Sequence, residues 1–229
     1  MGNKLIVLLL IGVFSTGAFA APLTVSPPLP TIKNIEINEQ AKDYEIEINY
    51  PSLKMRWSSK IEQAINREVK SLVNKNKTSF LKERTKPFNN LNNSLSLGYQ
   101  VPSLTTTVLS LKFSALVFYA GAAHPQHWIE TLNFDLKTGE KLSLAEICGG
   151  NKNYLKTISD YCIKELLART DLGPDEDWIR RGASPEASNF QYFNLTANDL
   201  IITFPDYQVA PYAAGEQEVA IGLEVLRCR

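Results

Sequence analysis

The sequence predicts an α+β fold with two lobes, each a long helix packed on an antiparallel sheet. Three observations support this fold class: segments in which apolar and polar residues alternate, two segments with apolar residues at helical spacing, and turn-forming residues between them. The order is strands, helix, strands, and it then repeats. We therefore expect α+β modules at residues 31–119 and 120–229, although one continuous two-lobed domain fits this order equally well.

Residues 1–20 have the features of a cleaved signal peptide. Lys4 precedes an apolar run from Leu5 to Phe14, and the segment ends in Ala18-Phe19-Ala20, a small-x-small cleavage pattern. The run is shorter than the roughly 20 residues of a membrane-spanning helix, which leaves a signal anchor as the minor alternative. We expect export to the periplasm or the medium, no membrane insertion after cleavage, and an extended proline-rich linker at residues 21–30.

The first module is predicted to place one long helix among strands. Alternation from Tyr44 to Tyr50 indicates a half-buried strand, which Pro51 closes. The helix should begin near Ser59, where Ser59 and Glu62 form a capping box, and should end before Pro87. Its apolar stripe comprises Ile61, Ile65, Val69, Leu72 and Phe80.

Two more strands are predicted between Ser94 and Phe118, the second of them central in a sheet. Alternation from Leu132 to Leu136, a turn at Lys137-Thr138-Gly139-Glu140, and renewed alternation from Leu142 to Leu144 predict a hairpin. A second helix should run from about Lys152 to Ala168, capped by Asn151 or Asn153. The remaining predicted elements are a short helix near residues 175–181 and strands around residues 190–195, 200–204 and 219–225.

Charge and cysteine content restrict the function classes. The chain has 24 basic and 24 acidic side chains, so it offers no long-range field for nucleic acid or anionic lipid. Its three cysteines are Cys148, Cys162 and Cys228, and an oxidising compartment would allow one disulfide. We expect Cys148 to pair with Cys162, whereas spacing alone leaves Cys162 with Cys228 open.

No catalytic motif is found in the sequence. It lacks a Gly-x-Ser-x-Gly elbow, a phosphate-binding glycine loop and a Cys-x-x-Cys pair. The two histidines, His124 and His127, flank Pro125 and lack the spacing of a helical metal site, so we expect neither a metal nor a cofactor. The acidic run Asp175-Glu176-Asp177 beside Trp178 is interpreted as the start of a short helix. A glycan hydrolase with an unrecognised carboxylate pair is the enzymatic alternative.

Two loops are the candidates for recognition. Residues 119–125 join two strands with small residues, and residues 205–215 join two others with prolines and tyrosines. Tyrosine supplies contact area at low entropic cost and proline pre-orders a loop, which favours partner binding. Packing of the same rings onto the core is the competing interpretation. The candidate partner-binding residues are Gly121, His124, Pro125, Tyr207, Pro211, Tyr212 and Gly215.

Three motifs carry a family resemblance: Gly121–Pro125, Asn133–Gly139 and Phe204–Gly215, the last with the pattern F-x-x-Y-x-V-A-P-Y-A-A-G. The chain resembles a family of bacterial extracytoplasmic domains. These domains occur in the lysozyme-sensing region of the anti-sigma-V factor and as accessory domains of some peptidoglycan deacetylases. Residues 44–53 with the following helix resemble the family's N-terminal module, and residues 120–226 resemble its C-terminal module.

The resemblance implies binding to a lysozyme-like protein or to cell-wall glycan through the two loops. The sequence shows neither the transmembrane helix and sigma-binding segment nor the deacetylase catalytic domain of those relatives, so signalling and deacetylation are not expected. The expected function is a non-enzymatic binding module of the cell envelope. The alternatives are the hydrolase and a purely structural envelope protein.

Overall fold

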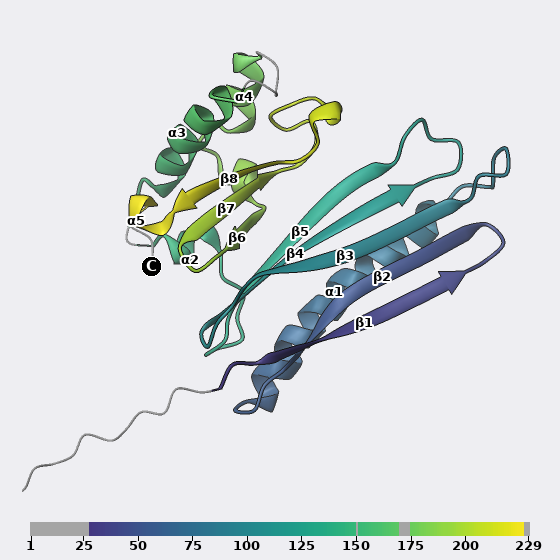
Figure 1. Cartoon of the computed structure of the whole chain (residues 1–229), viewed down its shortest axis with the longest axis horizontal. Helices are drawn as coiled ribbons and strands as arrows, with labels where there is room; N and C mark the ends of the chain where they lie inside the picture. Colours follow the sequence, from purple (N-terminus) through teal and green to yellow (C-terminus); the bar gives the residue numbers. More distant parts are fainter. Residues whose placement is uncertain (1–27, 150, 170–174, 227–229) are drawn as a thin grey trace, which may run out of the picture.

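The computed structural model describes residues 28–149, 151–169 and 175–226. The predicted signal peptide and residues 21–27 of the predicted linker lie outside these ranges. Within them, no helix combines the length and the apolar character that crossing a membrane requires. Two sheets and their helices form the α+β fold that the sequence predicts (Figure 1).

The larger sheet has five strands in sequential order. These strands are β1 (Thr31–Gln40), β2 (Tyr44–Lys54), β3 (Asn93–Leu104), β4 (Val108–Phe118) and β5 (Gln126–Asp135). All neighbours are antiparallel except β2 and β3, which are parallel. The prediction of an all-antiparallel sheet is therefore wrong for this pair. The helix between β2 and β3 returns the chain to the end of the sheet at which β2 begins, so the two strands run in the same direction.

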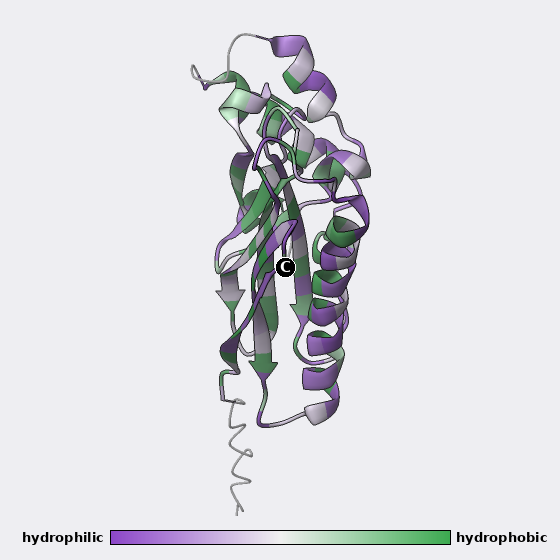
Figure 2. Ribbon diagram, turned by 90° about the vertical axis from the view of Figure 1, so that its right-hand side faces the viewer, coloured by the Kyte–Doolittle hydropathy of each residue, from purple (hydrophilic) through white to green (hydrophobic). Residues whose placement is uncertain are grey.

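That connecting helix, α1 (Ser59–Glu83), covers one face of the larger sheet (Figure 2). Its buried side chains join the first hydrophobic core: Ile65, Val69, Leu72, Val73 and Phe80. The cap is Ser58 rather than Ser59, because the Ser58 side chain accepts a hydrogen bond from the amide of Ile61. The Glu62 carboxylate instead accepts from the amide of Met55, at 2.9 Å, and this bond lowers its pKa.

The second module packs helices against a three-stranded antiparallel sheet of order β6-β7-β8. Its elements are α2 (Leu144–Ile147), α3 (Tyr154–Leu167), α4 (Glu176–Gly182), the 3₁₀ helix η1 (Ala187–Phe190), β6 (Phe193–Leu195), β7 (Asp199–Phe204), the 3₁₀ helix η2 (Tyr212–Ala214), β8 (Gln217–Gly222) and α5 (Leu223–Leu226). A second hydrophobic core, separate from the first, joins α3 to the sheet. The two cores agree with the two predicted lobes.

Two local predictions need correction. Strand β2 does not end at Pro51 but continues to Lys54; its parallel pairing with β3 stops at Ile48, so Pro51 has a neighbouring strand only in β1. The turn after β5 forms, with Gly139 at φ 81°, but the returning strand is reduced to a single bridge at Lys141. It is short because a capping box at Ser143 starts α2 two residues later.

Strand β5 pairs with β4 along its whole length. It therefore lies in the sheet of the first module, although the sequence pattern assigns it to the second. A module boundary at residue 119 would separate two hydrogen-bonded strands of one sheet. We propose that the division between the two modules lies after Asp135 rather than at residue 119.

The predicted cysteine pairing is wrong. Cys148 is disulfide-bonded, whereas Cys162 is a free, fully buried thiol, so Cys162 pairs with neither Cys148 nor Cys228. The reason is the position of Cys162 on α3: it shares the inward face with Ile158 and Leu166, one helical turn away on either side. Burial raises the pKa of the Cys162 thiol to about 12. Cys228 lies outside the described residues.

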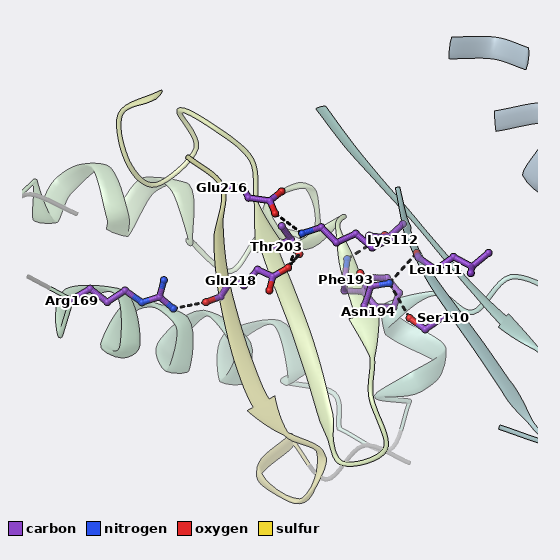
Figure 3. Close-up of polar contacts among 10 residues, drawn as sticks. Ser110, Leu111, Lys112, Arg169, Phe193, Asn194, Thr203, Glu216 and Glu218 are labelled. Carbon is purple, nitrogen blue, oxygen red and sulfur yellow. Dashed lines mark hydrogen bonds and ion pairs between the residues drawn. The ribbon is translucent and has the colours of Figure 1, made fainter. Parts of the chain in front are cut away.

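A polar joint connects the two modules (Figure 3). The hydroxyl of Ser110 on β4 accepts hydrogen bonds from the Asn194 side chain and the Leu195 amide of β6. Asn133 on β5 accepts from Ser110 and donates to the carbonyl of Phe193. We call Ser110, Lys112, Asn133 and Asn194 the polar joint. Because these contacts are directional, they fix how the smaller sheet sits on the larger one.

Lys112 extends the joint to β8. Its buried ammonium lies 2.6 Å from the carboxylate of Glu216 and 2.7 Å from that of Glu218. Burial alone would lower the pKa of Lys112, but its hydrogen bonds to the two glutamates raise it. Glu216 is the last residue of the loop that joins β7 to β8, so this contact positions one end of that loop.

Candidate functional site

The two loops singled out in the sequence lie together at one end of the molecule (Figure 1). Residues 119–125 join β4 to β5, and residues 205–216 join β7 to β8. The hydroxyl of Tyr212 donates a hydrogen bond of 2.9 Å to the carbonyl of Pro125. The rings of His124 and Tyr212 have centroids only 4.4 Å apart. Loops from different modules therefore form one continuous surface.

Four rings make up this surface, with Tyr212 in the middle. The centroid of Tyr212 lies 5.8 Å from that of His127 and 5.7 Å from that of Tyr207, in addition to its contact with His124. We call His124, His127, Tyr207 and Tyr212 the aromatic surface. Tyr212 is half-buried, whereas Tyr207 is 55% exposed and both histidines are exposed. Tyr212 thus packs the loops together, and the outer rings stay accessible.

The β7–β8 loop is held from below by α4. The indole of Trp178 donates to the carbonyl of Tyr207, and the Gln208 side chain donates to the carbonyls of Gly182 and Asn189. A side chain at Gly182 would stand 1.9 Å from the carbonyl oxygen of Gln208, so only glycine permits this approach. Tyr207 itself has φ 68°, an uncommon conformation for a bulky residue, and its side chain is exposed.

The other predicted site residues lie in the same two loops. Gly121 is exposed in a turn, Pro211 is exposed and precedes η2, and Gly215 ends η2 with φ 68°. The structure gives none of these three a side-chain contact across the loops. They shape the backbone, whereas His124, Pro125, Tyr207 and Tyr212 make the surface.

A pocket of about 540 Å³ opens beneath the aromatic surface, between the modules. Its lining includes Ser96, Ser114, Leu116, His127, Ile129, Asp206, Gly215 and Glu216. It lies on the β4 face that continues beyond the polar joint. No lysine or arginine occurs among its described lining residues, while two carboxylates do.

Asp206 is the site residue that sequence reasoning missed. Its side chain is 8% exposed, and neither carboxylate oxygen accepts a hydrogen bond from a described residue. The nearest cationic candidate is the Nδ1 atom of His127, at 3.3 Å from Oδ2, without hydrogen-bond geometry. Asp206 stands directly before Tyr207, but its burial depends on contact with a distant strand and leaves no signal in the sequence.

A larger hollow, of about 960 Å³, follows the solvent side of α1. Its described lining residues come from α1 alone and are polar or basic, and they include none of the predicted site residues. Within the described ranges, no three His, Cys, Asp or Glu side chains come together in a way that could hold a metal ion. The pocket below the aromatic surface is therefore the best candidate site.

Known proteins share both the sequence features and the fold. Residues 37–127 match the family model described as deacetylase PdaC, and residues 146–224 match that of a protein of unknown function, DUF3298. The peptidoglycan-N-acetylmuramic acid deacetylase PdaC of Bacillus subtilis (strain 168) is 26% identical over 198 residues, which cover 85% of this chain and 41% of that protein. The chain thus spans less than half of that relative.

Two solved structures of DUF3298 family members share the fold. One, from Bacteroides fragilis NCTC 9343, has a TM-score of 0.67 and 17% identity over 88% of this chain and 93% of its own. The other, from Pseudomonas aeruginosa PAO1, has a TM-score of 0.63 and 18% identity over 88% and 94%. Residues 37–127 thus resemble the PdaC family and residues 146–224 resemble DUF3298, and this pair of matches agrees with the family of accessory domains that the loop and hairpin motifs indicate.

Proposed function

We propose that this protein is an exported module of the cell envelope that binds peptidoglycan glycan through the aromatic surface. The observation that carries the proposal is the convergence of rings from two loops of different modules above a pocket. Concave sites rimmed by rings and containing a few polar groups are typical of ligand binding. The matched relative is named for action on peptidoglycan, which supports a cell-wall role for this chain.

The signal-peptide pattern of residues 1–20 supports export. We infer a non-enzymatic role, because the candidate site presents aromatic rings, Asp206 lies beside His127, and Glu216 is paired with Lys112. Binding would then depend on the rim rings for contact area and on the pocket for selectivity.

A lysozyme-like protein is the second candidate partner. The family resemblance suggests it, and the acidic pocket favours it, because Asp206 and Glu216 would suit a basic side chain of a protein. The two candidates use the same surface and are tested with the same variants.

Co-sedimentation with purified sacculi and capture on immobilised lysozyme test the proposal. Wild-type protein should be retained by sacculi at micromolar concentration. Tyr207→Ala should weaken retention at least about tenfold, because it removes an exposed ring that stacks on Tyr212. Val225→Ala is the matched control: it trims a side chain that is 47% exposed on α5, at the opposite end of β8, and should change nothing.

Three results would contradict the proposal. Absence of binding to both sacculi and lysozyme would remove it. Equal binding by Tyr207→Ala and wild type would move the site elsewhere. Release of muropeptides during incubation with sacculi would support the hydrolase instead.

A further inference from the structure

We propose that the pocket between the modules receives a protonated amino group of the glycan, so that the preferred sugar is a glucosamine unit without its acetyl group. The proposal rests on the proposed function and names the ligand chemistry of the same site. It starts from Asp206, a buried carboxylate that the fold leaves without hydrogen-bond donors.

Burial without donors is costly for a carboxylate. Most buried polar atoms have a hydrogen-bond partner, and an unpaired buried charge usually points to a functional requirement. Both Asp206 oxygens are buried, yet the residue lies on a pocket wall that a ligand can enter. An ammonium group offers three donors and a full positive charge, which makes it a strong partner for such a group.

The surrounding charges favour a cation as well. Asp206, Glu216 and Glu218 supply three carboxylates in this region, and Lys112 supplies one buried ammonium, which Glu216 and Glu218 share. Arg169 contacts the same strand, but it donates to the carbonyl of Glu218 (Figure 3) and to the Gln217 side chain. The carboxylates therefore exceed the cations that pair with them, and the surplus lies beside the pocket.

His127 controls access to Asp206. Its Nδ1 atom lies 3.3 Å from the carboxylate, while the side chain is 50% exposed. A half-exposed ring can rotate outward and leave its place to an entering amine, with no change in the backbone. An N-acetyl group is neutral and bulkier and supplies one N–H donor, so it gains much less from a buried charge. The pocket thus distinguishes an amine from an acetamide.

The ligand must come from a reaction of the amide-hydrolase class. Water cleaves the amide bond of an N-acetyl sugar, acetate leaves, and the sugar keeps a free amine that is protonated in neutral solution. This chain needs no catalytic group for that step, because it would recognise the product. The chain would therefore act after deacetylation of the sugar.

Isothermal titration with two defined probes tests the inference: the hexamer of glucosamine and the hexamer of N-acetylglucosamine. The wild-type chain should bind the glucosamine hexamer at least about tenfold more tightly. Asp206→Asn keeps the shape and removes the charge, and it should abolish this preference. Glu186→Gln, the same chemical change at an exposed residue outside the pocket, is the control and should retain it.

Thermal unfolding of the same variants separates recognition from a structural role. If Asp206 serves recognition, Asp206→Asn should unfold at the same temperature as wild type or higher, because it removes a buried carboxylate that accepts no hydrogen bond from a described residue. Loss of binding together with a lower unfolding temperature would overturn the inference.

The titration also separates this inference from the proposed function. Retention on sacculi with equal affinity for both hexamers would leave the proposed function standing and overturn the amine preference. Binding of lysozyme that depends on Asp206, with no binding of either hexamer, would assign the cation to a protein side chain and overturn the inference for glycan.

Discussion

The two halves of one face of β4 behave differently. Ser110 and Lys112 are 0% and 4% exposed and lie against β6 and β8 in the polar joint. Ser114 and Leu116, the next residues on the same face, are exposed and line the pocket. The same alternation of side chains thus gives a closed half and an open half, and the difference depends only on where the smaller sheet makes contact.

The two halves also differ in whether their buried polar groups have hydrogen-bond partners. In the closed half nearly every buried polar group has a partner, the exception being the Asn194 side-chain oxygen. In the open half a whole carboxylate, that of Asp206, has none. A joint built from directional hydrogen bonds fixes the angle between the sheets, and the angle brings the two loops together. The closed half therefore maintains the geometry, and the open half is left for a ligand.

The largest effect should come from breaking the closed half at its charge. Lys112→Met leaves Glu216 and Glu218 without their cation and should lower the free energy of unfolding by about 3 kcal/mol, the low end for a broken buried pair, because both glutamates are half exposed. Denaturant unfolding measures it. Lys75→Met, which affects an exposed pair 3.7 Å from Glu130, should cost under about 0.5 kcal/mol. Equal losses would show that the joint contributes no special stability.

A pair of serine variants compares the two halves directly. Ser110→Ala leaves the Asn133 acceptor, the Asn194 donor and the Leu195 amide without their partner and should cost about 2 kcal/mol. Ser114→Ala, four residues along the same strand and face, should change stability by less than about 0.5 kcal/mol, because its side chain is exposed. Chemical denaturation of both variants gives the comparison, and a costly Ser114→Ala would mean that the open half is packed after all.

Local patterns gave most of the fold. The stripe from Ile65 to Phe80 and the alternation from Tyr44 to Tyr50 are properties of neighbouring residues, so periodicity identified α1 and β2. The sequence singles out the Tyr212 and His124 loops by their composition, but the contact between them depends on how the two modules pack. Features that depend on contacts between distant segments were missed or misassigned, among them the parallel β2–β3 pair and the membership of β5 in the first sheet.

The disulfide and Asp206 show why those features escape the sequence. Spacing cannot tell whether Cys162 faces Cys148 or the core, because a helix rotates each residue by about 100° and the partner's position is set by tertiary packing. Burial of Asp206 likewise depends on β5, which is far away in the chain. An acidic residue in a loop is usually exposed, so the residue type predicts the opposite of what the fold produces here.

The smallest expected effect on stability concerns Tyr119, the first residue of the loop that joins β4 to β5. Its ring stacks on Phe80 and its hydroxyl donates to Glu83, so the loop is fixed at its start while its tip is exposed. Burial, followed by the bond to Glu83 and the charge of that carboxylate, raises the pKa of Tyr119 from 10.0 to about 12. Between these values the unfolded chain releases the phenol proton and the folded chain keeps it. The contribution is thus complete below pH 10 and is lost as the pH rises toward 12.

Tyr119→Phe isolates that contribution from the other alkaline titrations, among them that of Cys162. Unfolding free energies measured at pH 8 and at pH 11 should show the variant less stable than wild type at the lower pH, with a smaller difference at the higher one. A difference that is the same at both values would mean that the hydroxyl is not held by Glu83. In that case the loop would depend on the Tyr212 contact to Pro125 for its position, and removing that hydroxyl with Tyr212→Phe should then weaken binding as much as Tyr207→Ala does.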